Sequence, residues 1–297
     1  MSILLKEVDA LDIIDRFRGI NFWYCSLAVC VMFLLAFVHA ARWVAIIRAN
    51  GGEMSFTTSL KLVFVGYFFN QALPSSIGGD AIRIWQAHRS GLSLVVAINT
   101  VVIDRLIALA AMLIMTSVAL PWLMEIVVES GLRWVIVLVI IGGVCGFAAL
   151  LSLNRLPEFI CSWKVLRPFL QLSEDAKKIL PNSGGLTLAL SVGIHLGVAL
   201  VVFMIASALN VTVGLINCII LVPLVMLVSL FPVSIAGWGI REGAMVVALG
   251  LVQIPQSDAI SVSIIFGLLF LITSLPGGVL WWRTNHNGSN QVDHLKI

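Results

Sequence analysis

The chain has 297 residues, of which 60% are hydrophobic and 11% are charged, whereas about 25% of residues are charged in an ordinary soluble domain. So few charges cannot cover a soluble fold of this size, which excludes a conventional cytosolic enzyme and a nucleic-acid-binding protein. The small net charge of +3 fits basic loops beside a membrane. We therefore expect an all-α, polytopic integral membrane helix bundle.

Runs without charge mark the expected membrane segments. Residues 19–41 carry no charged side chain, and about 20 apolar residues cross a bilayer. Residues 1–18 are expected to form a cytoplasmic interfacial segment, because apolar residues recur there at helical spacing among charges. Further apolar stretches cover 56–74, 92–120, 134–154, 186–209, 215–232, 243–254 and 259–282. The pattern predicts about eight transmembrane segments.

The remaining segments are more polar. Residues 155–182 carry apolar side chains near helical spacing among Lys and Arg, which predicts an interfacial amphipathic segment bent at Pro168. The polar residues 182–185 are expected to form a break before the next span. Residues 284–297 are expected to form a polar tail.

The distribution of Lys and Arg predicts the orientation. If both termini are cytoplasmic, 13 of the 18 basic residues lie on the inner side, and the outer loops hold Arg42, Arg48, Lys61 and Arg133. The last one, Arg105, lies within an expected span. This bias predicts a multi-pass protein of the plasma membrane with both termini in the cytoplasm.

Two interruptions of the apolar pattern have similar amino-acid sequences. Residues 74–83 read PSSIGGDAIR and residues 232–241 read PVSIAGWGIR, with six of ten positions identical. Proline and glycine break a helix at such places, so we expect two broken helices, in repeat halves over 19–153 and 186–283. Whether the broken helices are re-entrant stays open. Whether the halves are parallel or inverted stays open. The motif residues are Pro74, Ser75, Ser76, Gly78, Gly79, Pro232, Ser234, Gly237 and Gly239.

Each interruption is followed by an Arg. A helix that restarts after a break exposes backbone N–H groups that bind anions, and Arg suits phosphate. We therefore expect Arg83 and Arg241 to line a hydrophilic cavity for an anionic lipid headgroup. In the alternative, purely structural interpretation, Asp80 caps its helix and Arg241 and Glu242 neutralise each other, or pair with Asp80 and Arg83 across the repeat.

Asp104 and Arg105 stand within an expected span, where ionisable residues are costly and by default functional. Adjacent helical residues point about 100° apart, so each needs a partner elsewhere. The candidates are Arg83 for Asp104 and Glu242 for Arg105, and the alternative is a buried structural ion pair. His39 and His195 are expected to be satisfied by neighbouring helices rather than to act as ligands.

Enzyme signatures are missing from the sequence. It contains no P-loop, no HExxH or His/Cys cluster and no GxSxG. We therefore expect no catalytic residue, metal or cofactor.

The text FFNQALPSSIGGDAIRIW followed by FPVSIAGWGIREGA resembles the flippase-like transmembrane domain of lysylphosphatidylglycerol synthase/flippase proteins and of stand-alone bacterial and archaeal membrane proteins. The matching motif residues are Pro74, Ser75, Gly78, Gly79, Asp80 and Arg83 in the first stretch, and Gly237, Gly239, Arg241 and Glu242 in the second. Asp104-Arg105 resembles the acidic-Arg pair of the family, and the resemblance spans about residues 20–283. After Arg283 only 14 residues remain, so the soluble aminoacyltransferase activity of fused relatives is not expected here.

The resemblance implies a lipid transporter that moves an anionic phospholipid or a polyprenyl-phosphate-linked lipid between leaflets. Two alternatives stay open. One is a non-transporting membrane partner of a lipid-synthesising enzyme or glycosyltransferase, and the other is a membrane transferase that uses a lipid-linked donor. The expected partners are membrane lipids and no nucleic acid.

Overall fold

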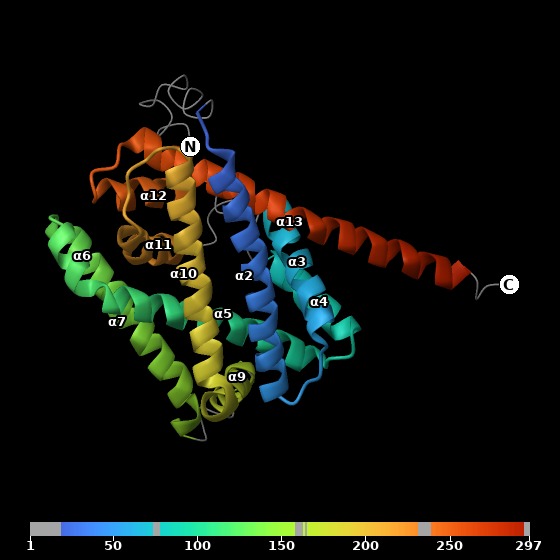
Figure 1. Ribbon diagram of the computed structural model, residues 1–297. Helices are drawn as coiled ribbons and strands as arrows, with labels where there is room; N and C mark the ends of the chain where they lie inside the picture. Colours follow the sequence, from blue (N-terminus) through green and yellow to red (C-terminus); the bar gives the residue numbers. More distant parts are fainter. Residues whose placement is uncertain (1–18, 74–77, 158–162, 164, 231–238, 294–297) are drawn as a thin grey trace.

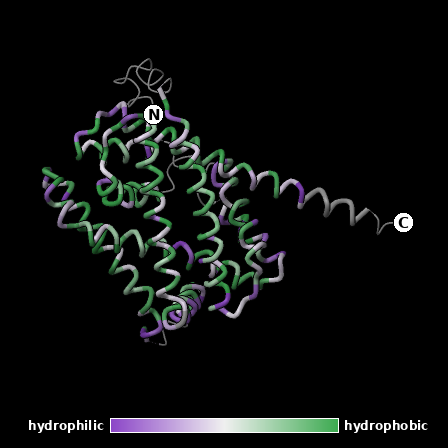
Figure 2. The backbone as a smooth tube through the Cα atoms, in the orientation of Figure 1, coloured by the Kyte–Doolittle hydropathy of each residue, from purple (hydrophilic) through white to green (hydrophobic). Residues whose placement is uncertain are grey.

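A computed structural model describes residues 19–73, 78–157, 163, 165–230 and 239–293 of the chain. Within these ranges the regular structure is helical and contains no strand (Figure 1), which confirms the expected all-α class. Hydrophobic residues line most of the length of the helices (Figure 2).

Helix α2 extends from Phe22 to Ala49, so it is longer than the charge-free run 19–41. It begins where the Asn21 side chain accepts a hydrogen bond from the backbone N–H of Trp23, at 3.0 Å. It continues through Arg42, which is buried, to Arg48 in its last turn. The assignment of Arg42 to an outer loop is therefore wrong, because a charge inside a bundle can be paired with a neighbouring helix.

Helices α3 (Phe56–Ala72) and α4 (Gly78–Arg89) flank the first interruption. Helix α3 begins at Ser55, whose Oγ accepts a hydrogen bond from the backbone N–H of Thr58 at 3.1 Å. Lys61 lies in the second turn of α3, so its assignment to an outer loop is also wrong. The motif residues Pro74, Ser75 and Ser76 lie outside the described residues.

Helix α5 (Leu94–Val118) holds Asp104 and Arg105 near its middle, and it is followed by α6 (Leu120–Ile126) and α7 (Ser130–Ser152). Among the described residues of α7, Ile136 is buried and most other side chains are exposed. Gly143 lies so close to Leu113 of α5 that an added Cβ would stand 2.4 Å from its side chain. This glycine permits close packing of α5 and α7.

Helix α9 (Arg167–Ile179) carries Pro168 in its first turn, where proline is tolerated. Helix α9 therefore begins beside Pro168, and because residues 158–162 and 164 lie outside the described residues, the expected bend stays a prediction. A π-helical turn, Leu180–Gly184, joins α9 directly to α10 (Gly185–Ala208). The polar break expected at 182–185 is therefore a widened helical turn rather than a loop.

Helices α11 (Leu215–Ser229) and α12 (Ile240–Gly250) flank the second interruption, and α13 extends from Gln256 to Asp293. Pro232, Ser234 and Gly237 of the motif lie outside the described residues. Helix α13 continues ten residues into the expected polar tail, and its C-terminal part projects from the rest of the chain (Figure 1).

Five of the described helices are long and apolar enough to cross a membrane: α2, α5, α7 with the turn after it, α10, and α13 as far as Thr284. Helix α11 is apolar but has 15 residues, and α12 has 11. The helices therefore support a multi-pass membrane protein, whereas the expected number of about eight spans is not confirmed.

The apolar core has two main parts. One joins α10, α11, α12 and α13 with the first half of α2, through residues such as Val202, Leu221, Leu249 and Val262. The other surrounds Trp43 of α2 and includes residues of α3, α4 and α5. Helices α2 and α10 lie side by side, with α5 crossing next to them (Figure 1). This crossing brings charged residues of several helices together.

Candidate functional site: an ionic cluster within the helix bundle

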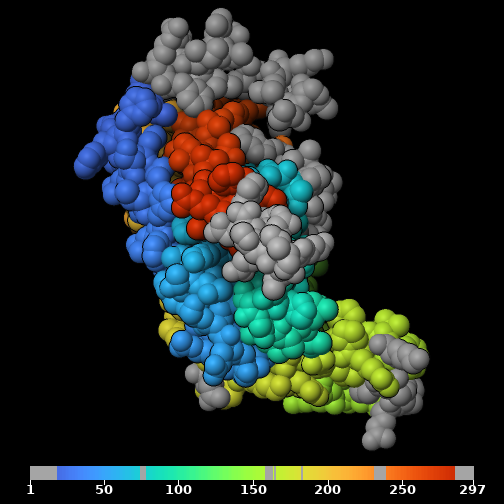
Figure 3. Space-filling model, turned by 90° about the vertical axis from the view of Figure 1, so that its right-hand side faces the viewer, coloured from blue at the N-terminus to red at the C-terminus, as the bar shows by residue number. Residues whose placement is uncertain are grey.

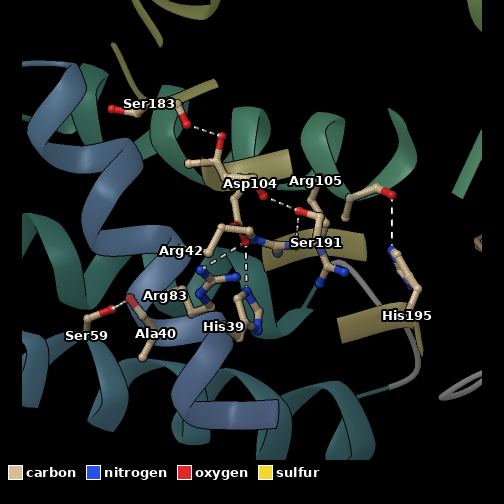
Figure 4. A network of polar contacts seen from close by, with 12 residues as sticks. His39, Ala40, Arg42, Ser59, Arg83, Asp104, Arg105, Ser183, Ser191 and His195 are labelled. Atoms are coloured by element: carbon tan, nitrogen blue, oxygen red, sulfur yellow. Dashed lines mark hydrogen bonds and ion pairs between the residues drawn. The ribbon is translucent and has the colours of Figure 1, made fainter. Parts of the chain in front are cut away.

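Asp104 of α5 lies at the centre of a group of charged side chains (Figure 4), and its side chain is 0% exposed. Its Oδ1 accepts a hydrogen bond from Arg42 Nε at 2.8 Å. Its Oδ2 lies 2.8 Å from His39 Nε2 and 3.4 Å from Arg83 Nη2. One carboxylate therefore joins α2, α4 and α5, and we call the whole group the Asp104 cluster (Asp104, His39, Arg42, Tyr67, Asp80, Arg83, Arg105 and Ser191).

The α2 side of the cluster is tied to two further helices. Arg42 Nη1 donates to Ser191 Oγ of α10 at 2.8 Å, and His39 Nδ1 lies 2.9 Å from the Tyr67 hydroxyl of α3. His39 and Arg42 are three residues apart, so they share one face of α2. Both ring nitrogens of His39 therefore have partners, as a buried imidazole requires.

Arg83 connects α4 to this centre. Its side chain is 3% exposed, and its Nη1 lies 3.4 Å from Asp80 Oδ1. Its guanidinium stands over the Trp43 ring, with 4.2 Å between Cζ and the ring centroid, as in a cation–π pair. Its Nε has no hydrogen-bond partner among the described residues. Arg83 is thus buried but keeps one unsatisfied donor.

Asp80 and Arg105 form the outer edge of the cluster. Arg105 donates from Nε to Asp80 Oδ2 at 2.7 Å and from Nη2 to Asp80 Oδ1 at 3.0 Å. The Arg105 side chain is 43% exposed and that of Asp80 is 14% exposed. Asp80 also lies in the first turn of α4, where the helix dipole favours a negative charge.

Glycines let α3 and α4 approach closely enough to build this edge. A Cβ on Gly79 would stand 2.1 Å from the Gly66 carbonyl oxygen, and one on Gly66 would stand 2.6 Å from Arg83 Cδ. The Gly79 N–H donates to Asn70 Oδ1 at 3.0 Å. Side chains at either glycine would push α4, and with it Asp80 and Arg83, away from α3.

The charges of the cluster do not balance. Arg42, Arg83 and Arg105 carry +3 and Asp80 and Asp104 carry −2, so the sum is +1 with His39 neutral. Four of these five side chains are at most 14% exposed. The cluster therefore carries a net charge of +1, and Arg105 is its most exposed member.

The second interruption carries a smaller polar group. Arg241 Nη2 donates to Glu242 Oε1 at 2.8 Å, and Ser263 Oγ of α13 lies 3.3 Å from both Arg241 Nε and Glu242 Oε1. Glu242 Oε2 accepts from the backbone N–H of Gly239, whose φ of +94° favours glycine. The start of α12 is thus capped by its own carboxylate, and Arg241 is neutralised by its neighbour.

Some of the contacts predicted from the sequence are present in the structure and others are not. Asp104 does contact Arg83, as predicted, whereas the expected pairing of Arg105 with Glu242 is wrong, because Arg105 binds Asp80. Arg83 and Arg241 are both buried and paired. Asp80 and Glu242 occupy the two helix starts, in line with the structural alternative.

Several members of the cluster were missed. The sequence predicts that Arg42 lies in an outer loop and that His39 is satisfied by neighbouring helices. The partners of His39 do lie on neighbouring helices, and they include Asp104. The spacing of His39 and Arg42 on one helical face was the available signal. His195 donates to or accepts from no member of the cluster, and its Nε2 lies 3.1 Å from the Ala108 carbonyl oxygen. Within the described ranges no three His, Cys, Asp or Glu side chains gather to hold a metal ion.

Comparison with known proteins shows the family to which the chain belongs. The model of the family described as "Lysylphosphatidylglycerol synthase TM region" matches residues 1–277. The chain is also 24% identical over 277 residues to the UPF0104 membrane protein MJ1595 of Methanocaldococcus jannaschii, and the match covers 84% of this chain and 81% of that protein. No solved structure matches. Since the family model covers most of the sequence, the chain belongs to the family of lysylphosphatidylglycerol synthase transmembrane regions.

Proposed function

We propose that the protein is a lipid transporter of the plasma membrane, with both termini in the cytoplasm. It moves an anionic phospholipid or a polyprenyl-phosphate-linked lipid between leaflets, and the Asp104 cluster receives the headgroup. The lipid crosses with its covalent structure unchanged, so no catalytic residue, metal or cofactor is assigned.

The observation that carries this proposal is the surplus positive charge of the Asp104 cluster beside an exposed arginine. Uncompensated charge within a membrane domain is expensive, and an anion that neutralises it is therefore bound favourably. Arg105 presents the group suited to this task, because its two-pronged contact with Asp80 is the geometry by which guanidinium groups hold phosphate oxygens. Asp80 thus stands in for the headgroup phosphate when no lipid is bound.

The second polar group has a related place in the other half of the chain. Glu242 and Arg241 lie in the first turn of a short helix that follows an interruption, as Asp80 does, whereas Arg83 lies in the second turn of its helix. We propose that Glu242 and Arg241 line the same lipid path at a later step, because a carboxylate-arginine pair can exchange its internal partner for a phosphate.

The test is lipid movement by the purified protein in liposomes. Phosphatidylglycerol with a fluorescent headgroup-side label is placed in both leaflets, and a membrane-impermeant quencher reports the fraction that changes leaflet. We expect the wild type to accelerate the exchange and Arg105→Gln to reduce the rate at least tenfold, with Arg105→Lys intermediate because Lys keeps the charge but not the fork. Arg48→Gln, which removes an exposed cation outside the cluster, is the matched control.

Two results would overturn the proposal. Equal rates for the wild type and for Arg105→Gln would remove the cluster from the lipid path. A wild type that retains anionic lipid through purification but does not accelerate exchange would favour the non-transporting partner of a lipid-synthesising enzyme or glycosyltransferase.

A further inference from the structure

Figure 3 shows the face on which α3 and α13 adjoin. Two cavities of opposite character lie beside these helices and have lining residues in common. One, of about 480 Å³, lies between α3, α4 and α13, and Thr58, Lys61, Trp85, Arg89 and Thr284 are among its lining residues. The other, of about 660 Å³, lies between α2, α3 and α13, and its lining includes Phe33, Phe37, Phe64, Pro276 and Val279. Lys61 and Leu280 line both cavities. We call the pair the α3/α13 groove; none of its lining residues belongs to the Asp104 cluster.

The first cavity is electropositive. Its lining includes the cations Lys61 and Arg89 and no carboxylate. Neither cation has an ion-pair partner among the described residues. The Arg89 guanidinium lies over the ring of Trp85, with 4.9 Å between Cζ and the ring centroid, which orients it without neutralising it. Two cations that have no carboxylate partner among the described residues, around one cavity, favour an anionic group of phosphate size.

The second cavity is apolar apart from Lys61 and Thr57. Three phenylalanines from α2 and α3 face a proline and a valine of α13 across it. Its floor is a close crossing of two helices, since a Cβ on Gly277 would stand 1.9 Å from the Phe64 carbonyl oxygen. Such a surface has no group to orient a polar ligand, whereas it suits a hydrocarbon chain.

We propose that the α3/α13 groove binds one molecule of an anionic phospholipid. Its phosphate lies between Lys61 and Arg89, and one acyl chain lies along Phe37, Phe64 and Val279. The argument is the adjacency of the two cavities: a molecule that fills both must carry an anion at one end and hydrocarbon at the other. Trp85, which is 44% exposed at this rim, is the residue type that lies at the level of lipid headgroups. The inference does not depend on transport, because it needs only a chain that lies in a membrane.

The first experiment is native mass spectrometry of the detergent-purified full chain, titrated with phosphatidylglycerol or with phosphatidylcholine of the same acyl chains. We expect the first bound lipid to be selectively phosphatidylglycerol. Since each basic residue contributes about fivefold to binding of an anionic lipid, Lys61→Gln/Arg89→Gln should weaken it about 30-fold. Arg48→Gln/Arg155→Gln removes two exposed cations outside the groove and should leave the affinity unchanged.

A second variant tests the apolar half without changing charge. Val279→Trp fills the second cavity and should expel the lipid, whereas Ile272→Trp, an exposed position of α13 that does not line the groove, should retain it. Thermal unfolding of each variant shows that the fold is kept.

Three outcomes would overturn the inference. Equal lipid binding by the groove variants and their controls would remove the groove as the site. Displacement of the lipid by millimolar glycerol phosphate would identify a site for free phosphate esters. A dimer that carries no lipid and dissociates in Val279→Trp would identify a second copy of the chain as the occupant. Because every readout is binding, failure here leaves the exchange assay on Arg105 unaffected.

Discussion

Asp80 accepts two hydrogen bonds from Arg105, at 2.7 and 3.0 Å, across the contact between α4 and α5. The same carboxylate lies 3.4 Å from Arg83. Asp80, in the first turn of α4, thus binds the guanidinium group of Arg105, which we propose as the group that binds the lipid phosphate. If Arg105 binds the lipid phosphate as we propose, Asp80 and the lipid compete for it.

This competition gives the first prediction. Asp80→Asn raises the net charge of the Asp104 cluster from +1 to +2 and frees Arg105, so the protein should retain anionic lipid about tenfold more tightly. The measurement is quantitative mass spectrometry of lipids that copurify in mild detergent. Glu53→Gln makes the same change of charge on an exposed loop residue and should leave retention unchanged. Weaker retention by Asp80→Asn would show that Asp80 holds Arg105 in place rather than blocking it.

The second prediction concerns the centre of the cluster. Asp104→Asn leaves Arg42 and Arg83 buried without their shared carboxylate, and breaking a buried ion pair on one side costs about 3–5 kcal/mol of stability. The midpoint of thermal unfolding in detergent should therefore fall clearly. Glu125→Gln, at an exposed carboxylate of α6, is the control and should not move it. An unchanged midpoint for Asp104→Asn would mean that water reaches the two arginines.

The third prediction compares two glycines. At Gly277 a Cβ would stand 1.9 Å from a backbone oxygen of α3, so Gly277→Ala must separate α13 from α3 and should destabilise the fold by about 1–3 kcal/mol. At Gly146 no neighbour lies within 4 Å of the added carbon, and Gly146→Ala should be neutral or slightly stabilising because Ala favours helix. Thermal unfolding of the pair measures the difference. Similar midpoints would show that α13 can shift at no cost.

The fourth prediction concerns the attachment of α9 to α5. Asp175 accepts from Asn99 Nδ2 at 2.6 Å and from Lys178 Nζ at 2.8 Å. Asp175→Ala should release α9 and raise hydrogen exchange along it, because the buried Asn99 amide loses its partner. The hydrogen bond to Asp175 raises the pKa of Lys178 above its ordinary value. The Lys178 side chain is exposed, however, and an exposed ion pair contributes little to stability. Lys178→Gln should therefore have little effect on hydrogen exchange. Equal hydrogen exchange along α9 in both variants would show that the apolar contacts of Ile179, rather than Asp175, attach α9 to α5.

The apolar runs located most helices within a few residues of their observed ends, as the matches at α3, α7 and α10 illustrate. Apolar runs predict these helices because residues that face lipid must be apolar over the thickness of the bilayer. The prediction failed in α2, where Arg42 ends the charge-free run but the helix continues to Ala49. The partner that permits this, Asp104, is 62 residues away, and a local pattern contains no sign of it.

The candidate site was partly predictable for the same reason. Asp104 and Arg105 are predicted as site residues because a charge within a membrane span is costly. Asp80 and Arg83 are predicted because they follow an interruption of the apolar pattern. The pairing of Arg105 with Asp80 rather than with Glu242 depends on how closely α4 approaches α5. The position of α4 depends in turn on its close contact with α3 at Gly66 and Gly79, which only the packed helices reveal.

The separation of Arg42 and Asp104 along the chain has a consequence for biosynthesis. At a synthesis rate of about 5–20 residues per second, α2 leaves the ribosome roughly 3–12 s before its counterion. An unpaired Arg at the centre of a helix opposes insertion by about 2.5–3.5 kcal/mol. We therefore expect insertion of α2 to be completed only when α5 supplies this counterion. Truncated chains that end before Asp104 should leave α2 incompletely inserted.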